Sequence, residues 1–300
     1  MNYQYIVHRG LTTKQVIERY ETHSFPSFRQ KSNVRNLQEP FFVIEVKLNE
    51  IIVGLSIVEF MTDQKVLKVL SLKVHEDYQR KGIASQMLKV AEQIAKNNSA
   101  FYTNIVFQDN WNSFKIMPKL LEKTGWDKPQ HRLTLAKLHY NQVKDLPWFQ
   151  IKDYPENFTV TDWSNFTSND KEYILSKQNS DNWYPEILSP FQLENILIKE
   201  GSLLLKYKSE IIGWITIHLV SSKSIQITSF FIDKEHRNTK ASICLIRDAI
   251  ERVYKNEIAE QAIFMFEASN KTMLTLSKKI AGDNNTGAFT KVWVSQKLIQ

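Results

Sequence analysis

The residues best suited to chemistry run from Val74 to Ala84, where an apolar strand pattern passes into an amphipathic helix pattern. Gly82 has no side chain, so an anion can approach the backbone closely there. The N–H groups of the first helical turn have no partners inside the helix and point outward. The helix dipole and the charges of Arg80 and Lys81 add to the attraction for an anion. The segment predicts a diphosphate site; the alternative is an ordinary strand-to-helix turn with a glycine for steric relief.

The same segment resembles the acyl-CoA signature of the GNAT superfamily of N-acyltransferases. That signature is Gln or Arg, two free positions, Gly, one free position and then Gly or Ala, matched here by Gln79, Gly82 and Ala84. Glu76 stands where the family commonly has Pro. The resemblance implies acetyl-CoA or another acyl-CoA as donor, and no metal. The residues that it assigns to donor binding are Leu72, Lys73, Val74, Gln79, Arg80, Lys81, Gly82, Ile83, Ala84, Ser85 and, in a turn after the fifth strand, Asn112.

Acyl transfer from a thioester to an amine needs a deprotonated amine and a donor for the oxyanion. By the resemblance, the strand ending at Val74 splays from its neighbour, and the Val74 N–H is the candidate oxyanion donor. Glu59 interrupts an apolar stretch near a strand end and is the candidate general base; the alternative is that it faces solvent by strand alternation. The family's usual acid is a tyrosine, but that position holds Leu121. The remaining candidates for the acid are Tyr102, Tyr140 and water.

The apolar pattern around these residues predicts an α/β fold. Strands interleaved with helices indicate a twisted mixed sheet flanked by helices. The expected strands are 41–47, 51–61, 66–74, 101–107 and 132–138, and the expected helices begin at Gly82 and lie around 118–123.

The second half of the chain repeats this order, which predicts two domains of one kind. Gly54 precedes Val74 by 20 residues, and Gly213 precedes Ile232 by 19. We expect an acyl-CoA-binding GNAT-like domain over 1–142 and a degenerate GNAT-like domain over 150–300 that binds the acceptor or is structural. The segments expected in the second copy are 203–208, 211–220, 224–232, 239–255, 261–267, 270–281 and 288–294.

The two copies differ at the predicted diphosphate site. Arg237 aligns with Gln79, and Lys240 aligns with Gly82. Lys240 brings a Cβ and a long side chain to the place where phosphate must contact backbone, so we expect the second copy to have lost ordinary CoA binding. His218 aligns with Glu59 and is interpreted as a satisfied polar residue or, as the alternative, one that bridges the domains.

The amino-acid composition limits the classes of protein to which this chain can belong. A chain of 300 residues with 42% hydrophobic and 24% charged residues describes a soluble protein with two ordinary domains. We see no transmembrane-length apolar run and no secretory signal, and therefore expect a cytoplasmic protein without a membrane partner. The single cysteine, Cys244, predicts a packed thiol rather than a disulfide. The net charge of +7 is dispersed among acidic residues, which disfavours nucleic acid as a partner.

The sequence thus predicts an acyl-CoA-dependent, in the first place acetyl-CoA-dependent, N-acyltransferase. The amine of a small molecule, amino-acid derivative or peptide attacks the thioester directly. Arg29, Lys31 and Arg35 are candidates for binding a carboxylate or phosphate of the acceptor, or belong to a solvated loop. The alternatives are a non-catalytic acyl-CoA-binding or regulatory protein and an aminoacyl-tRNA-dependent transferase; a homodimer stays open.

Overall fold

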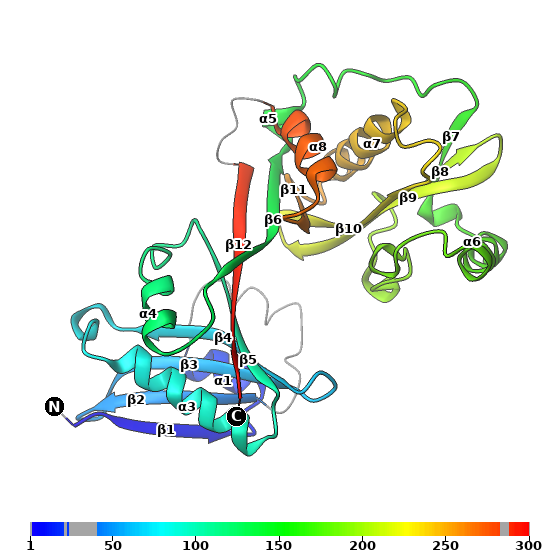
Figure 1. Ribbon diagram of the computed structural model, residues 1–300. Helices are drawn as coiled ribbons and strands as arrows, with labels where there is room; N and C mark the ends of the chain where they lie inside the picture. The colour runs from blue at the N-terminus through cyan, green and yellow to red at the C-terminus, as the bar shows by residue number, and fades with distance from the viewer. Residues whose placement is uncertain (1, 21–22, 24–40, 283–287, 300) are drawn as a thin grey trace. The chain divides into compact units, whose positions relative to one another are not determined.

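Two units make up the chain, each a mixed sheet with helices packed on it (Figure 1). The computed structural model describes residues 2–20, 23, 41–282 and 288–299. One unit is formed by Met1–Leu133 with Thr290–Gln300, and the other by Thr134–Phe289. The predicted α/β fold is confirmed. None of the helices in these ranges has the length and apolar character needed to span a bilayer.

The first unit has the strand order β1-β2-β3-β4-β5-β12. β4 and β5 run parallel and are connected through α3, whereas the other neighbouring strands of this unit are antiparallel. A parallel pair requires such a crossover connection. The elements are β1 (Gln4–Arg9), α1 (Thr13–Tyr20), β2 (Phe41–Leu48), β3 (Ile51–Met61), β4 (Val66–Val74), η1 (Glu76–Tyr78), α3 (Ile83–Asn97), β5 (Tyr102–Gln108), α4 (Met117–Lys123) and β12 (Phe289–Leu298).

The second unit has the strand order β6-β11-β10-β9-β8-β7. Its elements follow the order of the first unit, which confirms the predicted repeat. They are β6 (Gln130–His139), α5 (Tyr140–Val143), β7 (Phe158–Asp162), η2 (Trp163–Asn165), α6 (Ser168–Asp181), η3 (Glu186–Leu188), η4 (Glu194–Ile196), β8 (Leu203–Tyr207), β9 (Glu210–Ser221), β10 (Ser224–Ile232), α7 (Ala241–Lys255), β11 (Gln261–Glu267) and α8 (Lys271–Ala281).

Most of the last strand of each predicted copy falls in the other unit, residues 134–139 of β6 in the second and residues 290–298 of β12 in the first. This corrects the expectation that 132–138 and 288–294 complete their own copies. β12 pairs antiparallel with β5 of the first unit. Within that unit the Lys297 ammonium also donates to Glu92 Oε2 at 2.8 Å and to the Thr124 carbonyl at 2.7 Å. β6 lies beside β11 in the second unit. The limits 1–142 and 150–300 stay a prediction for the domains themselves.

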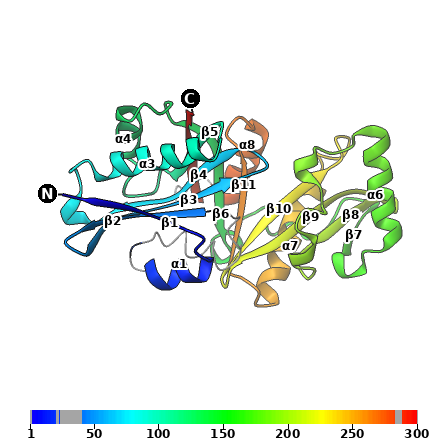
Figure 2. The same ribbon diagram turned by 90° about the horizontal axis from the view of Figure 1, so that it is seen from below.

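The sheet of the first unit has a separate core on each face. α3 packs on one face and α1 on the other (Figure 2). On the α1 face, Val16 and Tyr20 pack against Val43, Leu55 and Ile57. The face of α3 predicted to be buried is confirmed, and consists of Ile83, Met87, Leu88, Ala91, Ile94 and Ala95.

Candidate functional site

The candidate site begins at the gap between β4 and β5, which pair only over their first parts. The last parallel pair is Val69 with Ile105. β4 nevertheless continues to Val74, and β5 continues to Gln108. One backbone edge of β4 is therefore open toward β5 over the second half of the strand.

A β-bulge in β4 explains why the strands separate at this point. Opposite β3, Ser71 pairs with Ile57 and Val69 pairs with Val58, so Leu70 is an extra residue on β4. A bulge bends its strand and increases the local twist. Beyond Leu70, β4 stays bonded to β3 but turns away from β5.

The open edge presents the backbone groups of Leu72 and Val74. The His75 N–H donates to the Val53 carbonyl at 2.9 Å, which makes these two residues a hydrogen-bonded pair. Hydrogen-bonded and non-hydrogen-bonded pairs alternate along an antiparallel ladder. The N–H and C=O groups of Val74 and Leu72 therefore face away from β3, toward the gap. The backbone groups of Lys73 lie between them and face β3.

The loop after β4 brings the chain to the start of α3 through Gly82. This residue has φ +82° and ψ −2°, a left-handed conformation that strongly favours glycine. A Cβ built on Gly82 would meet no heavy atom within 4 Å. The protein itself leaves the space over this Cα open. Arg80 also has a positive φ, +62°.

The first turn of α3 presents backbone donors beside this space. The Gln86 N–H donates to the Gly82 carbonyl at 3.0 Å and makes the first bond of the helix. The N–H groups of Ile83, Ala84 and Ser85 precede this bond and have no acceptor inside the helix. The Ile83 side chain is buried in the core, so only its backbone can contribute to the site.

Side chains of the loop hold the turn together. Gln79 Nε2 donates to the Val74 carbonyl at 3.3 Å. The Lys81 ammonium donates to the Asp77 carbonyl at 2.9 Å and lies 4.9 Å from the centre of the Tyr78 ring. The signature glutamine thus ties the loop to the strand end, and Lys81 brings positive charge close to Gly82.

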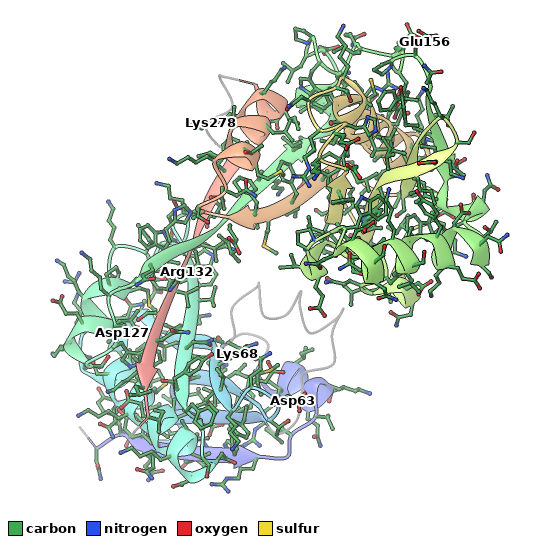
Figure 3. The ribbon with its side chains drawn as sticks, turned by 45° about the vertical axis from the view of Figure 1, so that its right-hand side comes forward. Asp63, Lys68, Asp127, Arg132, Glu156 and Lys278 are labelled. Carbon is green, nitrogen blue, oxygen red and sulfur yellow. The ribbon has the colours of Figure 1, made fainter. Side chains whose placement is uncertain are left out.

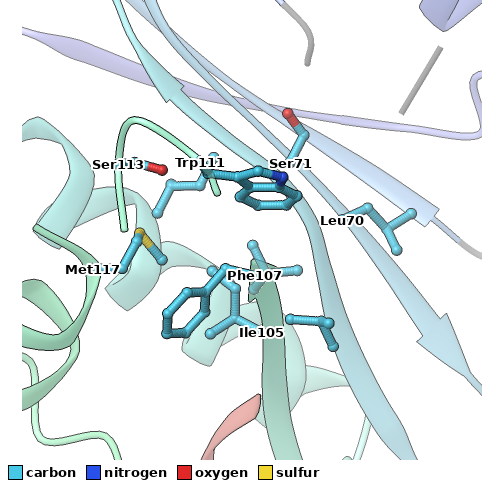
Figure 4. A pocket seen from close by; sticks show the side chains of 10 residues that line it. Leu70, Ser71, Ile105, Phe107, Trp111, Ser113 and Met117 are labelled. Carbon is cyan, nitrogen blue, oxygen red and sulfur yellow. The ribbon is translucent and has the colours of Figure 1, made fainter. Parts of the chain in front are cut away.

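A cavity lies where β4 and β5 separate (Figure 4). Its lining is mostly apolar, as suits an uncharged acyl group or the end of a pantetheine arm. Trp111 lies between the two strands in Figure 4, with Phe107 on β5 and Met117 on the α4 side. Asn112 is exposed in the turn beside Trp111. The lining residues are Val69, Leu70, Ser71, Leu72, Ile105, Val106, Phe107, Trp111, Ser113 and Met117.

The structure places Glu59 beside the last paired residues of β4 and β5, where the gap begins, and far from Val74. Glu59 pairs with Lys68, which lies near the start of β4 and the turn that holds Asp63 (Figure 3). Lys68 precedes Val74 by six residues, which is about 20 Å along an extended strand. The Glu59 side chain is only 9% exposed, so it does not face solvent either. Glu59 and the Val74 N–H are too far apart to act directly on one thioester.

The tyrosine position and its substitutes have the following surroundings. Leu121 is fully buried in the core under α3. Tyr102 pairs with Val66, at the end of β5 where the strands are still joined. Tyr140 belongs to the second unit, where its ring stacks on Tyr254 at 3.7 Å and burial raises the pKa of its hydroxyl. Arg29, Lys31 and Arg35, the predicted acceptor-binding residues, lie outside the described residues.

A buried carboxylate that the sequence analysis missed lies on the α1 face. Glu45 is 1% exposed and accepts a hydrogen bond of 2.7 Å from the Tyr20 hydroxyl. His8 Nε2 and Lys47 Nζ lie 3.5 Å and 3.4 Å from its carboxylate oxygens. Burial alone would raise the pKa of Glu45, but the hydrogen bond from Tyr20 and the electrostatic effect of His8 and Lys47 outweigh it and lower the pKa. The sequence feature that could have predicted this buried carboxylate is a charged residue inside the apolar strand 41–47.

The second unit repeats the backbone geometry at the corresponding strand end. The Asp233 N–H donates to the Ile212 carbonyl at 2.7 Å, as His75 does to Val53. Arg237 Nε donates to the Ile232 carbonyl at 2.8 Å, as Gln79 does to Val74 in the first unit. These bonds support the alignment of the two copies.

The loop of the second unit does not adopt the left-handed turn of the first. Lys240 has φ −61°, an ordinary right-handed conformation. Ser242 Oγ donates to the Arg237 carbonyl at 3.1 Å, and Thr239 Oγ1 donates to the His236 carbonyl at 2.8 Å. The loop thus satisfies part of its own backbone. This geometry supports the expectation of a degenerate site.

Two expectations for the second unit are confirmed. His218 is buried and hydrogen-bonded through both ring nitrogens, Nδ1 to Thr228 Oγ1 at 2.5 Å and Nε2 to the Leu193 carbonyl at 3.0 Å. Burial lowers the pKa of His218, in keeping with a neutral, satisfied residue. Cys244 is a fully buried thiol.

Comparison with known proteins agrees with this geometry. Residues 9–116 match the model of the acetyltransferase (GNAT) family. A tandem GNAT protein from the clavulanic acid biosynthesis pathway superposes with a TM-score of 0.68 at 12% identity, covering 100% of this chain and 99% of that chain. A GCN5-related N-acetyltransferase from Sphaerobacter thermophilus gives 0.65 at 15% identity, covering 99% and 96%. A sequence search of curated proteins found no match. The chain thus has the tandem GNAT fold, and its first unit carries the acetyltransferase sequence features.

Proposed function

We propose that this protein is an N-acyltransferase that uses acetyl-CoA and acts on the amine of a small molecule, an amino-acid derivative or a peptide. The observation that carries the proposal is a pair of backbone N–H sets at the two ends of one loop. One set lies on the open edge of β4, and the other follows left-handed Gly82 in the first turn of α3.

The residues at the two ends of this loop fit an acyl-CoA. The space over Gly82, which a Cβ would enter without meeting protein atoms, admits a diphosphate to the N–H groups of residues 83–85. Arg80 and Lys81 would add positive charge. The N–H groups of Leu72 and Val74 would bind the pantetheine arm and the thioester carbonyl along the open edge. When bound, acetyl-CoA supplies an activated acyl group.

Catalysis in this proposal depends chiefly on positioning and on backbone donors. Holding the amine against the thioester removes a bimolecular penalty of about 7–11 kcal/mol at best. No carboxylate is present among the described residues that line the gap. We therefore expect the amine to lose its proton to water, so that the rate rises with pH toward the pKa of the amine.

A second candidate function, acyl-CoA binding without turnover, is favoured by the position of Glu59 and by the buried leucine in the tyrosine position. The test is to incubate the protein with acetyl-CoA and a panel of amines, and to measure thiol release and the mass of the acylated amine. The only cysteine is buried, so the protein contributes little background. Amine-dependent release with a matching product supports the transferase. A CoA-induced rise in Tm without product supports the binder, and no CoA binding removes both and leaves the aminoacyl-tRNA-dependent transferase.

A further inference from the structure

Each unit has a serine directly after its β-bulge, Ser71 in β4 and Ser229 in β10. In the second unit, Ile227 forms the last parallel pair with Phe264 of β11. Opposite β9 the register shifts between Ile227 and Ser229, which makes Thr228 the extra residue. The order of last parallel pair, bulge and serine is the same in β4. The two serines are structurally equivalent.

Ser229 has its hydrogen bonds supplied by the chain itself. Its Oγ donates to the Leu188 carbonyl at 2.6 Å and accepts a bond of 2.9 Å from Trp214 Nε1. Leu188 is the last residue of η3, a short turn that follows α6. A peptide carbonyl therefore lies against the strand just beyond the bulge, on the face that also carries Trp214.

Ser71 occupies the same place without such a partner. Its side chain is 2% exposed, and its Oγ has no hydrogen-bond partner among the described residues. In the second unit, Trp214 pairs with Phe231. The equivalent pair in the first unit is Leu55 with Lys73, so Ser71 has no indole N–H as a donor. Buried hydroxyls are nearly always hydrogen-bonded, and an exception calls for an explanation.

The position of Ser71 places it at the start of the open edge of β4. Ser71 precedes Leu72, whose N–H faces the gap. It pairs with Ile57 and so shares the sheet face covered by α1. Figure 4 shows its hydroxyl directed away from Trp111 and Phe107. Ser71 thus lines the cavity, and its hydroxyl points toward the sheet face that α1 covers.

We propose that Ser71 binds the acyl acceptor by donating a hydrogen bond to a carbonyl oxygen close to the reacting amine. The Leu188 carbonyl on Ser229 is the internal counterpart of that group. This inference rests on the proposed function and narrows it: the acceptor is an amino-acid amide or a peptide rather than a simple alkylamine. Ser71 is a substrate-binding residue in this assignment and forms no covalent bond.

The test compares two amines of similar shape, alaninamide and isopropylamine. For each amine, kcat/KM is calculated from the concentration of its unprotonated form. For the wild type we expect a higher kcat/KM with alaninamide. Ser71→Ala lowers kcat/KM for alaninamide roughly 3- to 10-fold more than for isopropylamine, which is the range of one lost hydrogen bond. The KM for acetyl-CoA stays within twofold, and Ser71→Thr, which keeps the hydroxyl, restores the preference. The matched control Ser229→Ala leaves the preference between the amines unchanged.

The proposal is overturned if Ser71→Ala lowers both amines equally, or if the wild type prefers isopropylamine. A wild type that acetylates amines without regard to a neighbouring carbonyl refutes this inference but leaves the transferase standing. A wild type that transfers to no amine refutes the proposed function, and the Ser71 assignment falls with it.

Discussion

Replacing Gly82 by alanine separates the ligand-binding role of the loop from its role in folding. Gly82 has φ +82°, and an added Cβ meets no heavy atom within 4 Å. The substitution therefore strains the backbone without a clash inside the protein. An L-residue in the left-handed region costs about 1–2 kcal/mol. We expect Gly82→Ala to lower the free energy of unfolding by that amount, measured by urea denaturation.

Gly10 provides a matched control for this strain. Its φ is +68°, and a Cβ added there also meets nothing within 4 Å. Gly10 directly follows β1 and is not part of the loop before α3. Gly10→Ala should therefore lower the free energy of unfolding by about the same 1–2 kcal/mol, without touching the proposed CoA site.

The two variants should differ in their response to CoA. A ligand at 100 times its Kd stabilises the folded state by about 2.7 kcal/mol. A methyl group over Gly82 prevents the close approach of phosphate to the backbone and removes at least one hydrogen bond to a charged group, worth about 1.5–3 kcal/mol. A tenfold or larger rise in Kd reduces the stabilisation at the same CoA concentration to about 1.4 kcal/mol or less. Gly10→Ala keeps the full 2.7 kcal/mol.

Thermal and urea denaturation with and without CoA measure this difference, and calorimetric titration gives Kd directly. Equal stabilisation of Gly82→Ala and Gly10→Ala by CoA would refute the assignment of the loop. Loss of CoA binding in both variants would show that strain anywhere in the unit, rather than contact at Gly82, is responsible.

Three further results follow from the same geometry. Lys240→Gly should not add a second CoA site, because Lys240 has φ −61° and its loop does not make the left-handed turn of Gly82; a calorimetric stoichiometry of two would contradict this. Glu59→Gln should keep kcat within about threefold, since Lys68, the residue opposite Glu59, lies about 20 Å along β4 from Val74, the candidate oxyanion donor; a loss of a hundredfold would restore Glu59 as the base. Tyr20→Phe should lower the free energy of unfolding at pH 7 by about 1.5–3 kcal/mol, because it removes the donor to a buried carboxylate. The pKa of Glu45 is lowered in the folded state, so this stabilisation is present above the ordinary carboxyl pKa and is lost as the pH falls through the folded value. The difference between the wild type and Tyr20→Phe should thus shrink as the pH falls below the ordinary carboxyl pKa, and a difference that grows on acidification in urea titrations would contradict the role of the carboxylate.

The local parts of the site could be predicted from the sequence. The buried face of α3 follows from helical periodicity, and the special conformation of Gly82 follows from the lack of a side chain between a strand and a helix. The alignment of Gln79 with Arg237 holds at the level of individual hydrogen bonds. Each of these features depends on residues within a few positions of one another along the chain.

Features that depend on register could not be predicted. The bulge at Leu70 has no distinctive residue, yet it decides where β4 leaves β5. The distance between Glu59 and Val74 depends on this register, so the apolar stretch around Glu59 could not predict it. The exchange of β6 and β12 is hidden for a related reason: both strands carry the pattern of a sheet strand, and either sheet can accept such a strand at the edge of β5 or β11.

The difference between the two units indicates which of them binds ligands. Buried polar groups need partners, so a duplicated site that no longer meets a ligand is expected to acquire them from its own chain. The second unit has done so, with the Leu188 carbonyl on Ser229 and the Ser242 hydroxyl on the loop. In the first unit, the Ser71 hydroxyl has no partner among the described residues and the space over Gly82 is open. Because the two backbones share the same bulge and strand-end hydrogen bonds, this contrast supports the proposal that the first unit is the one that binds a ligand.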